Sequence, residues 1–226
     1  MTGVQTCALP ISGEGAAERA LSLAAIRQQM GDDEGVARAL RLGFEASPGH
    51  AELRARLADF YNGRERWADL AEMLAAEGAA AEGATSVARL REAAALYLDK
   101  LDRPADATTA LALAASRAPG DLSLLVELAR CLGRAGRPDE SRERIGNALV
   151  RDDITAADRV ALLRLRAELS TEPDQLADAI VDLEAAYALS PAVAPDLAAG
   201  LERLRTTPAG SGDRSLLLRL FDVTLD

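Results

Sequence analysis

The chain has 226 residues and a formal net charge of −10, because 26 Lys and Arg stand against 36 Asp and Glu. An acidic balance of this size argues against a protein that binds nucleic acid or an anionic membrane. The 48 Ala and 36 Leu favour helices, whereas aromatic residues make up only 3% of the chain. No apolar run approaches the roughly 20 residues of a membrane-spanning helix. With 49% hydrophobic residues, the chain is also too apolar to be disordered.

The first segment, Met1–Ser12, differs in composition from the rest of the chain. It has neither the positively charged start nor the long apolar stretch of a signal peptide. The string Val4–Ile11 resembles the translation of a common sequencing adapter. We therefore expect an artificial tail, in which case the authentic protein extends further upstream. The alternative is a genuine disordered N-terminal tail. The compartment consequently stays open, with the cytoplasm slightly favoured.

Behind this tail, one pattern recurs with internal spacings of 4, 3 and 5 residues. Its copies are Val36, Leu40, Gly43 and Pro48; Ala107, Leu111, Ala114 and Pro119; Ser141, Ile145, Ala148 and Asp153; and Ala179, Leu183, Ala186 and Pro191. The second and third copies are 34 residues apart. Steps of four and three residues return to one face of a helix, so the pattern predicts a repeated amphipathic helix.

Helical segments of a second kind lie before and between these copies. Their apolar residues are Ala20, Leu23 and Ala24; Leu57, Ala58 and Tyr61; Leu90, Ala93, Ala94 and Tyr97; and Leu125, Leu128, Ala129 and Leu132. Turn signals such as Ser47-Pro48-Gly49 and Gly136-Arg137-Pro138 separate the two kinds of segment. One helix pair cannot bury both of its apolar faces, so we expect the pairs to stack and form a continuous core.

These positions resemble the tetratricopeptide repeat (TPR), a 34-residue unit of two antiparallel helices. The segment Leu122–Thr155 fits best, although Ser141 replaces a small Ala and Asp153 replaces a Pro. The resemblance implies an all-α fold, a right-handed superhelical solenoid of antiparallel helix pairs over residues 13–226. We expect five to six pairs, with the part after Pro191 forming a degenerate last pair or a cap.

Several residues of the core need a separate interpretation. The second unit places Glu77 where the family usually has a small residue. Trp67, Phe60 and Tyr61 predict an aromatic core plug, with an aromatic pocket as the alternative. One of the two cysteines lies in the tail, which leaves Cys131 alone on a helical stripe. The position of Cys131 on this stripe predicts a small buried hydrophobic residue. With only one cysteine outside the tail, an internal disulfide is excluded for the rest of the chain.

Residues that could perform chemistry are scarce. The single histidine, His50, lies in a turn with no second ligand at a suitable spacing. Glycine-rich strings lack the strand and the Lys-Ser/Thr of a phosphate loop. Paired acids such as Asp32-Asp33 and Asp152-Asp153 stand at helix starts, where they interact favourably with the helix dipole. We expect a protein that is not an enzyme and has no metal, cofactor or catalytic residue.

The resemblance to TPR proteins implies a ligand surface on the concave face, lined by the first helix of each pair. The candidate partner-binding residues are Gln28, Asp59, Asn62, Arg91, Arg130 and Arg134, with Gln29, Asp99, Asp158 and Glu168 at further positions of this kind. The carboxylate clamp of chaperone-binding members is absent, since Arg56 and Glu127 stand at the corresponding positions.

Arg91, Arg130 and Arg134 predict a local basic surface within an acidic protein. Such a surface would bind an acidic segment or a terminal carboxylate through charge-assisted hydrogen bonds. The alternative is that these are ordinary solvated charges.

Three functions stay open from the sequence. The first is a non-enzymatic scaffold of a bacterial repeat protein that binds a peptide or partner protein on the concave face. The second is the regulatory or sensory arm of a multidomain enzyme or transcription factor, truncated upstream. The third is a structural element of an envelope or secretion complex. We expect a monomer that neither binds nucleic acid nor inserts into a membrane.

Overall fold

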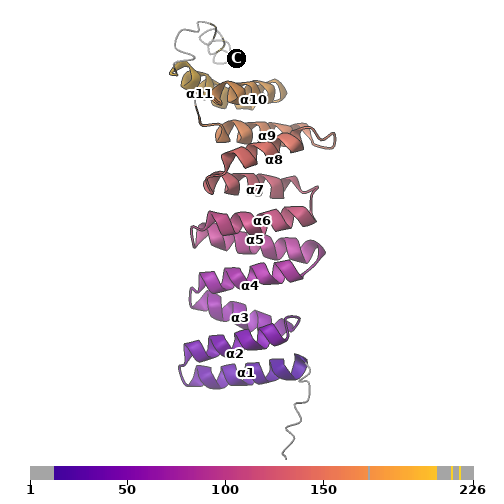
Figure 1. The fold of residues 1–226 in the computed structure, drawn as a ribbon, viewed down its shortest axis with the longest axis vertical. Helices are drawn as coiled ribbons and strands as arrows, with labels where there is room; N and C mark the ends of the chain where they lie inside the picture. The colour runs from indigo at the N-terminus through magenta and orange to yellow at the C-terminus, as the bar shows by residue number, and fades with distance from the viewer. Residues whose placement is uncertain (1–12, 173, 208–214, 216–218, 220–226) are drawn as a thin grey trace, which may run out of the picture. The chain divides into compact units, whose positions relative to one another are not determined.

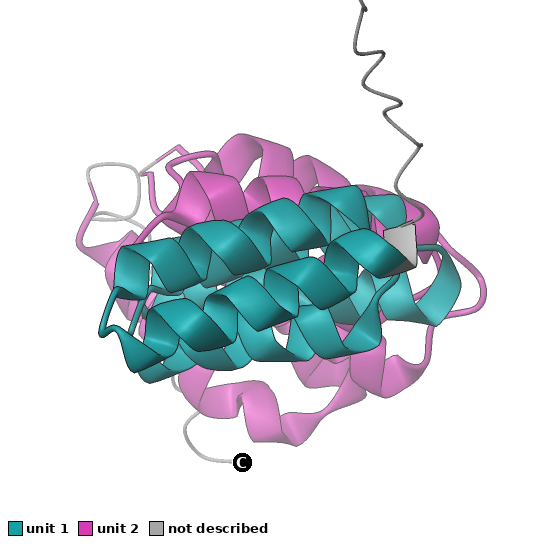
Figure 2. Cartoon of the chain, turned by 90° about the horizontal axis from the view of Figure 1, so that it is seen from below, with its two compact units in different colours: residues 1–101 teal, residues 102–226 magenta. Residues whose placement is uncertain are grey.

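The computed structural model describes residues 13–172, 174–207, 215 and 219. The chain divides into two compact units, Met1–Leu101 and Asp102–Asp226, which Figure 2 shows in different colours. The interpretation of residues 1–12 as a tail lies outside the described residues. Most of the expected loop and last helix after Thr206 also lies outside them.

The described part of unit 1 consists of helices joined by short turns (Figure 1). They are α1 (Gly13–Gln29), α2 (Asp33–Ala46), α3 (Ala51–Gly63), α4 (Trp67–Ala80) and α5 (Gly83–Asp99). Unit 2 contains α6 (Pro104–Arg117), α7 (Leu122–Arg134), α8 (Pro138–Leu149), α9 (Ala156–Leu169), α10 (Leu176–Leu189), the 3-10 helix η1 (Pro191–Val193) and α11 (Ala194–Arg205). Successive helices pack side by side within each unit, which confirms the predicted all-helical array of paired helices.

The turns follow the signals in the sequence. Asp32 caps α2 by accepting a hydrogen bond from the Gly35 N–H at 2.9 Å, and Asp121 caps α7 in the same way. Pro104 and Pro138 begin α6 and α8, where a missing N–H costs nothing.

One position of the turn inside each of the first four pairs has a left-handed backbone. It holds Gly31, Glu65, Asp102 and Gly136, with φ angles of 69°, 54°, 48° and 73°. Glycine adopts this conformation without strain, whereas Glu65 and Asp102 do so at a cost. The turn geometry therefore belongs to the repeat and holds even where the sequence lacks glycine.

Small residues let successive helices approach closely in unit 1, both within a pair and between pairs. A Cβ added to Gly43 of α2 would lie 2.3 Å from the Ala20 Cβ of α1. A Cβ on Gly78 of α4 would lie 2.6 Å from Leu90 Cγ of α5, and Ser86 donates to the Gly78 carbonyl at 2.6 Å. Side chains larger than glycine do not fit at either contact without a shift of the helices.

Unit 2 compensates for its departures from the usual repeat residues by hydrogen bonding. Ser141 is fully buried, and its hydroxyl donates to the Ala129 carbonyl at 2.8 Å. Cys131 is buried as predicted, and its Sγ lies 3.3 Å from Thr108 Oγ1 and from the Pro104 carbonyl. Burial raises the pKa of the Cys131 thiol, which keeps it protonated and unreactive.

The aromatic residues divide between core and surface. Tyr61 is 2% exposed and belongs to the core. Phe60 and Trp67 are only half-buried, and the Lys100 ammonium lies 5.2 Å from the centre of the Trp67 ring. The predicted core plug therefore holds for Tyr61 alone.

Candidate functional site

Each unit has a groove between two successive first helices, with the second helix of the pair as its floor. The unit 1 groove encloses about 300 Å³ and is lined by Ala24, Gln28, Asp33, Val36, Leu40, Arg56, Asp59, Phe60, Gly63 and Arg64 of α1 to α3 and the turn after α3. The unit 2 groove encloses about 360 Å³ and is lined by Arg164, Ala167, Glu168, Leu176, Ala179, Leu183, Asp196, Ala199, Gly200 and Arg203 of α9 to α11.

The two grooves occupy the same place in the repeat. A shift of 143 residues relates lining positions of one to lining positions of the other. The related pairs are Ala24 and Ala167, Asp33 and Leu176, Val36 and Ala179, Leu40 and Leu183, Arg56 and Ala199, and Phe60 and Arg203. The groove is thus a product of the repeat geometry, and the residues at these positions set its chemistry.

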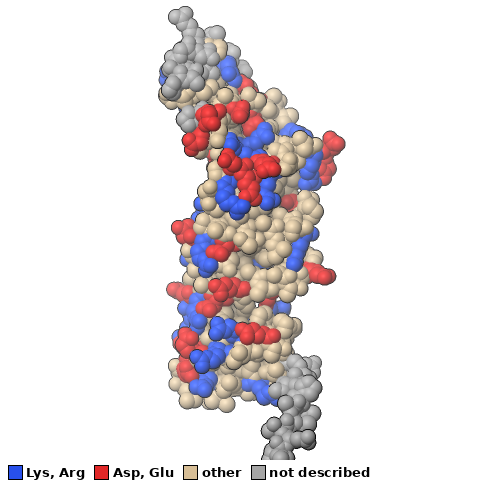
Figure 3. Space-filling view, in the orientation of Figure 1, with Lys and Arg blue, Asp and Glu red and all other residues tan. Residues whose placement is uncertain are grey.

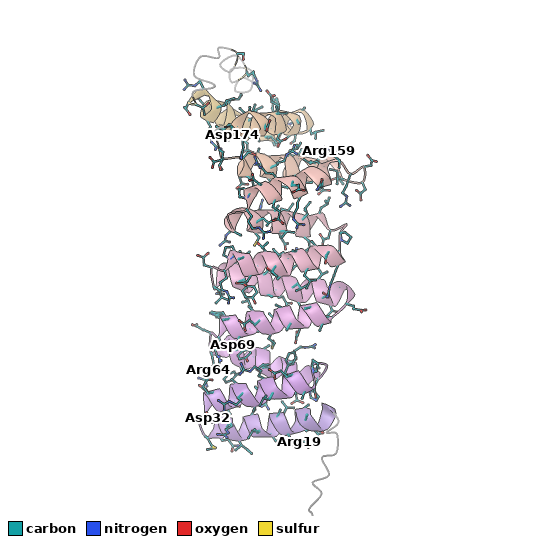
Figure 4. All side chains as sticks on the ribbon, viewed as in Figure 1. Arg19, Asp32, Arg64, Asp69, Arg159 and Asp174 are labelled. Carbon is teal, nitrogen blue, oxygen red and sulfur yellow. The ribbon has the colours of Figure 1, made fainter. Side chains whose placement is uncertain are left out.

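Charged side chains dominate the rim of the unit 1 groove. Arg64 Nη2 lies 2.6 Å from Asp33 Oδ1, and the Arg64 guanidinium stacks over the Phe60 ring, 5.9 Å from its centre. Arg66 continues this network by pairing with Glu34 and Asp69. Figure 4 shows that Arg64 and Asp69 lie at the same edge of unit 1 as Asp32.

The network places side chains of positive and of negative charge next to the groove. The Gly35 N–H, followed by the Arg27 guanidinium, holds the pKa of Asp32 below its ordinary value. Acidic and basic side chains also lie intermingled on the face of each unit that Figure 3 shows. The unit 1 groove is therefore suited to a polar segment with charges of either sign.

The unit 2 groove has a more apolar lining. Leu176, Ala179 and Leu183 form its floor, and Ala199 and Gly200 form one wall. An added Cβ on Gly200 would lie 3.0 Å from Leu183 Cδ1, so glycine keeps this part of the groove open.

A charged pair closes the rim of the unit 2 groove. Arg164 Nη2 lies 2.6 Å from Asp196 Oδ2. The groove is therefore suited to an apolar side chain flanked by polar groups.

Three of the residues proposed from the sequence line these grooves. Gln28 and Asp59 lie together in the unit 1 groove, and Glu168 lies in the unit 2 groove. Asn62 is exposed on α3 but does not line the groove. Asp158 interacts with the capping residue of α9, since the Thr155 hydroxyl donates to its carboxylate at 2.7 Å.

The predicted arginine surface is split between the two units. Arg91 is half-buried on α5 of unit 1, whereas Arg130 and Arg134 are exposed on α7 of unit 2. Arg134 Nη2 lies 3.6 Å from Asp102 Oδ1, a distance typical of a weak surface pair. A joint surface of the three arginines stays a prediction. Gln29 and Asp99 are exposed near helix ends.

The groove residues Phe60, Arg64 and Gly200 were not predicted as site residues. Phe60 was assigned to the core, and Arg64 follows the end of α3. Gly200 lies in the last described helix, where the repeat pattern is weak. The shift of 143 residues relates Phe60 to Arg203, whereas it places Arg64 at Thr207 and Gly200 at Leu57, which line neither groove.

The single histidine has a structural contact. His50 caps α3, and its Nδ1 accepts a hydrogen bond from the Leu53 N–H at 3.3 Å. Within the described ranges, no group of three or more His, Cys, Asp or Glu side chains could hold a metal ion. No helix in the described part of the chain is long and apolar enough to cross a membrane.

No protein-family model and no curated protein matches the chain. Among solved structures, it is similar to YrrB, described as a TPR protein with an unusual peptide-binding site, at 14% identity over 84% of this chain and 93% of that one, with a TM-score of 0.49. The comparison with the MamA protein gives 14% identity over 78% of this chain and 92% of that one, with a TM-score of 0.46. The comparison with a thermophilic TPR protein from Thermus thermophilus gives 16% identity over 93% of this chain and 100% of that one, with a TM-score of 0.41.

Proposed function

We propose that the protein is a non-enzymatic interaction scaffold that binds peptide segments of a partner protein in its grooves. The observation that carries this proposal is the recurrence of one groove at the same repeat position in both units, with Leu40 or Leu183 in the floor and charged residues at the rim. A concave apolar floor with few polar groups around it is the usual form of a binding site.

The two grooves support different contributions to binding. An apolar side chain of the peptide would enter the unit 2 groove, where Gly200 leaves room beside Leu183. Polar residues of the peptide would contact Gln28, Asp59 and Arg64 in the unit 1 groove. An acidic residue of a partner segment is proposed to contact Arg130 of unit 2.

A peptide array tests this function. Peptides selected by the wild-type chain should bind Ala199→Glu at least about tenfold more weakly, because the longer charged side chain would fill the space beside the apolar floor of the groove. Ala199 is exposed, so the substitution should leave the fold intact. Arg56→Glu makes the related change in the unit 1 groove, since Arg56 stands at the position of Ala199.

The matched control is Val181→Glu, which adds the same charge at an exposed position of α10 outside both grooves. It should bind the selected peptides as the wild type does. Unchanged affinity in both Ala199→Glu and Arg56→Glu would refute binding in the grooves. Arg130→Glu tests the acidic contact separately, and unchanged affinity there would remove only that contact.

A further inference from the structure

The unit 2 groove has two charged rim residues that pair with nothing in the described part of the chain. Glu168 of α9 and Arg203 of α11 line opposite walls of the groove, and both side chains are exposed. Neither side chain takes part in an ion pair or a hydrogen bond within the described ranges. Arg164 and Asp196, from the same two helices, do meet at 2.6 Å. The two walls are therefore bridged at one place and unbridged at another.

Helix spacing places both unpaired charges beyond the bridged place. Glu168 follows Arg164 by four residues, and Arg203 follows Asp196 by seven, so each lies on the same helix face as its predecessor. At about 1.5 Å per residue, they lie roughly 6 Å and roughly 10 Å further along their helices. The groove rim thus presents a carboxylate and a guanidinium near the C-terminal ends of α9 and α11, and these two groups do not reach each other.

The position of Glu168 favours a basic ligand group beside it. Glu168 stands in the last turn of α9, where the carbonyl ends of the helix carry a partial negative charge and attract cations. Arg166, the basic residue of this turn, is already bound to Asp182. The carboxylate of Glu168 therefore adds to the negative potential at this end of the helix, and a cation of the ligand would relieve it.

The surface between the two unpaired charges is apolar. Leu176, Ala179 and Leu183 form the floor of the groove and are buried. Gly200 leaves space beside Leu183. A ligand that contacts both charges crosses this floor, so it gains most from an apolar side chain placed between its two charged groups.

The unit 1 groove offers a different arrangement. Its rim is bridged by Arg64 and Asp33 at 2.6 Å. The other charged residues of its lining, Arg56 and Asp59, both belong to α3, whereas Gln28 of α1 is neutral. Of the two grooves, that of unit 2 is therefore the one that presents unlike, unpaired charges from opposite walls.

We propose that the unit 2 groove selects partner segments in which an apolar residue lies between a basic and an acidic residue. The basic side chain binds Glu168 and the acidic side chain binds Arg203, each through charge-assisted hydrogen bonds. Segments with two basic or two acidic residues bring one like charge against the rim and bind more weakly. The selection rests on the proposed function, and it adds the chemistry of the partner segment at one groove.

Fluorescence anisotropy with short synthetic peptides tests this selection on the full chain. Each peptide has one leucine in a Gly-Ser background with Lys or Glu on either side, which gives the patterns Lys-Leu-Glu, Glu-Leu-Lys, Lys-Leu-Lys and Glu-Leu-Glu. The better of the two mixed peptides should bind the wild type at least about threefold more tightly than either peptide with two like charges. Added salt should reduce this preference, because salt screens exposed charges.

Charge reversal separates the two contacts. Glu168→Lys should make Glu-Leu-Glu the tightest ligand, whereas Arg203→Glu should make Lys-Leu-Lys the tightest. Both positions are exposed, so circular dichroism should show unchanged helix content. The matched control is Glu143→Lys, which makes the same change of net charge at an exposed position of α8 outside both grooves. It should keep the wild-type preference.

Equal binding of the four peptides by the wild type would mean that Glu168 and Arg203 are ordinary solvated charges, and it would overturn the selection. Failure of all four peptides to bind would overturn it as well, and so would a preference that both reversals leave unchanged. Ala199→Glu distinguishes these results from a failure of the proposed function. Peptides that lose affinity for Ala199→Glu without showing the charge preference would leave groove binding in place and remove only the selection.

Discussion

The unit 1 groove and the unit 2 groove have the same floor position, Leu40 in one and Leu183 in the other, but they present different chemistry. Asp33 and Phe60 line the first, where Leu176 and Arg203 line the second. The backbone of a helix-pair repeat thus influences where a groove forms, because stacked pairs leave the same space in both units. The residues that line this space are free to differ, so the two grooves present different chemistry.

The units also differ in how they hold a buried acid. In unit 2, Asp182 of α10 accepts two hydrogen bonds from the guanidinium of Arg166 of α9, one of them at 2.7 Å. In unit 1, Glu77 of α4 has Arg54 and Arg89 at 3.8 Å and 3.3 Å, and neither carboxylate oxygen accepts a hydrogen bond. The first acid is fully paired, whereas the second is held by charge alone.

The largest effect should come from breaking the paired acid. Asp182→Ala leaves the Arg166 guanidinium partly buried and unpaired, so we expect the free energy of unfolding to fall by about 3 kcal/mol. Asp182 is 6% exposed and the Arg166 side chain 30% exposed, so solvent replaces the lost bonds only in part. Denaturant unfolding followed by circular dichroism measures the change.

Glu143→Ala is the control for this prediction, because it removes an exposed carboxylate of α8. It should change the free energy of unfolding by less than about 0.5 kcal/mol. If Asp182→Ala had as small an effect, the Arg166 pair would not stabilise unit 2 more than a surface pair does.

The turn inside each pair should give an effect of intermediate size. Gly31→Ala places a side chain on a left-handed residue and should lower the free energy of unfolding by about 1 kcal/mol. Glu65→Gly removes the same strain at the equivalent turn and should raise it, by up to about 1 kcal/mol. Thermal unfolding of the two variants should therefore shift in opposite directions. Shifts of the same sign would show that the two turns are not equivalent.

The paired helices and their turns could be predicted because their signals are local. The turn at Gly136 and the helix start at Pro138 follow from residue type alone. Gln28 and Asp59 were also predicted to share a surface, because the repeat register places successive first helices side by side.

Two features of the structure could not be predicted in this way. The free space of the unit 2 groove beside Gly200 depends on which side chain of another helix faces this glycine, and here that side chain is Leu183. The exposure of Leu23 depends on the absence of a covering helix in the described part of the chain, although Leu57 at the same repeat position is buried. Both are properties of packing between elements, which single-sequence periodicity does not contain.

The smallest effect should depend on pH and concerns Glu77. Burial raises the pKa of this carboxyl above its ordinary value, and the attraction of Arg54 and Arg89 only partly opposes the rise. Because the folded state then binds the proton more tightly than the unfolded state, ionised Glu77 reduces stability at neutral pH. The reduction disappears as the pH falls below the ordinary pKa of a glutamate, since both states are then protonated.

Glu77→Gln removes this titration while keeping the size of the side chain. The difference in free energy of unfolding, variant minus wild type, should therefore be more positive at pH 7 than at pH 4. Glu72→Gln, an exposed position of α4, should show no such change with pH. A difference that grows toward low pH would mean that the two arginines stabilise the ionised carboxylate by more than burial destabilises it. The acid of unit 1 would then resemble the paired acid of unit 2 after all.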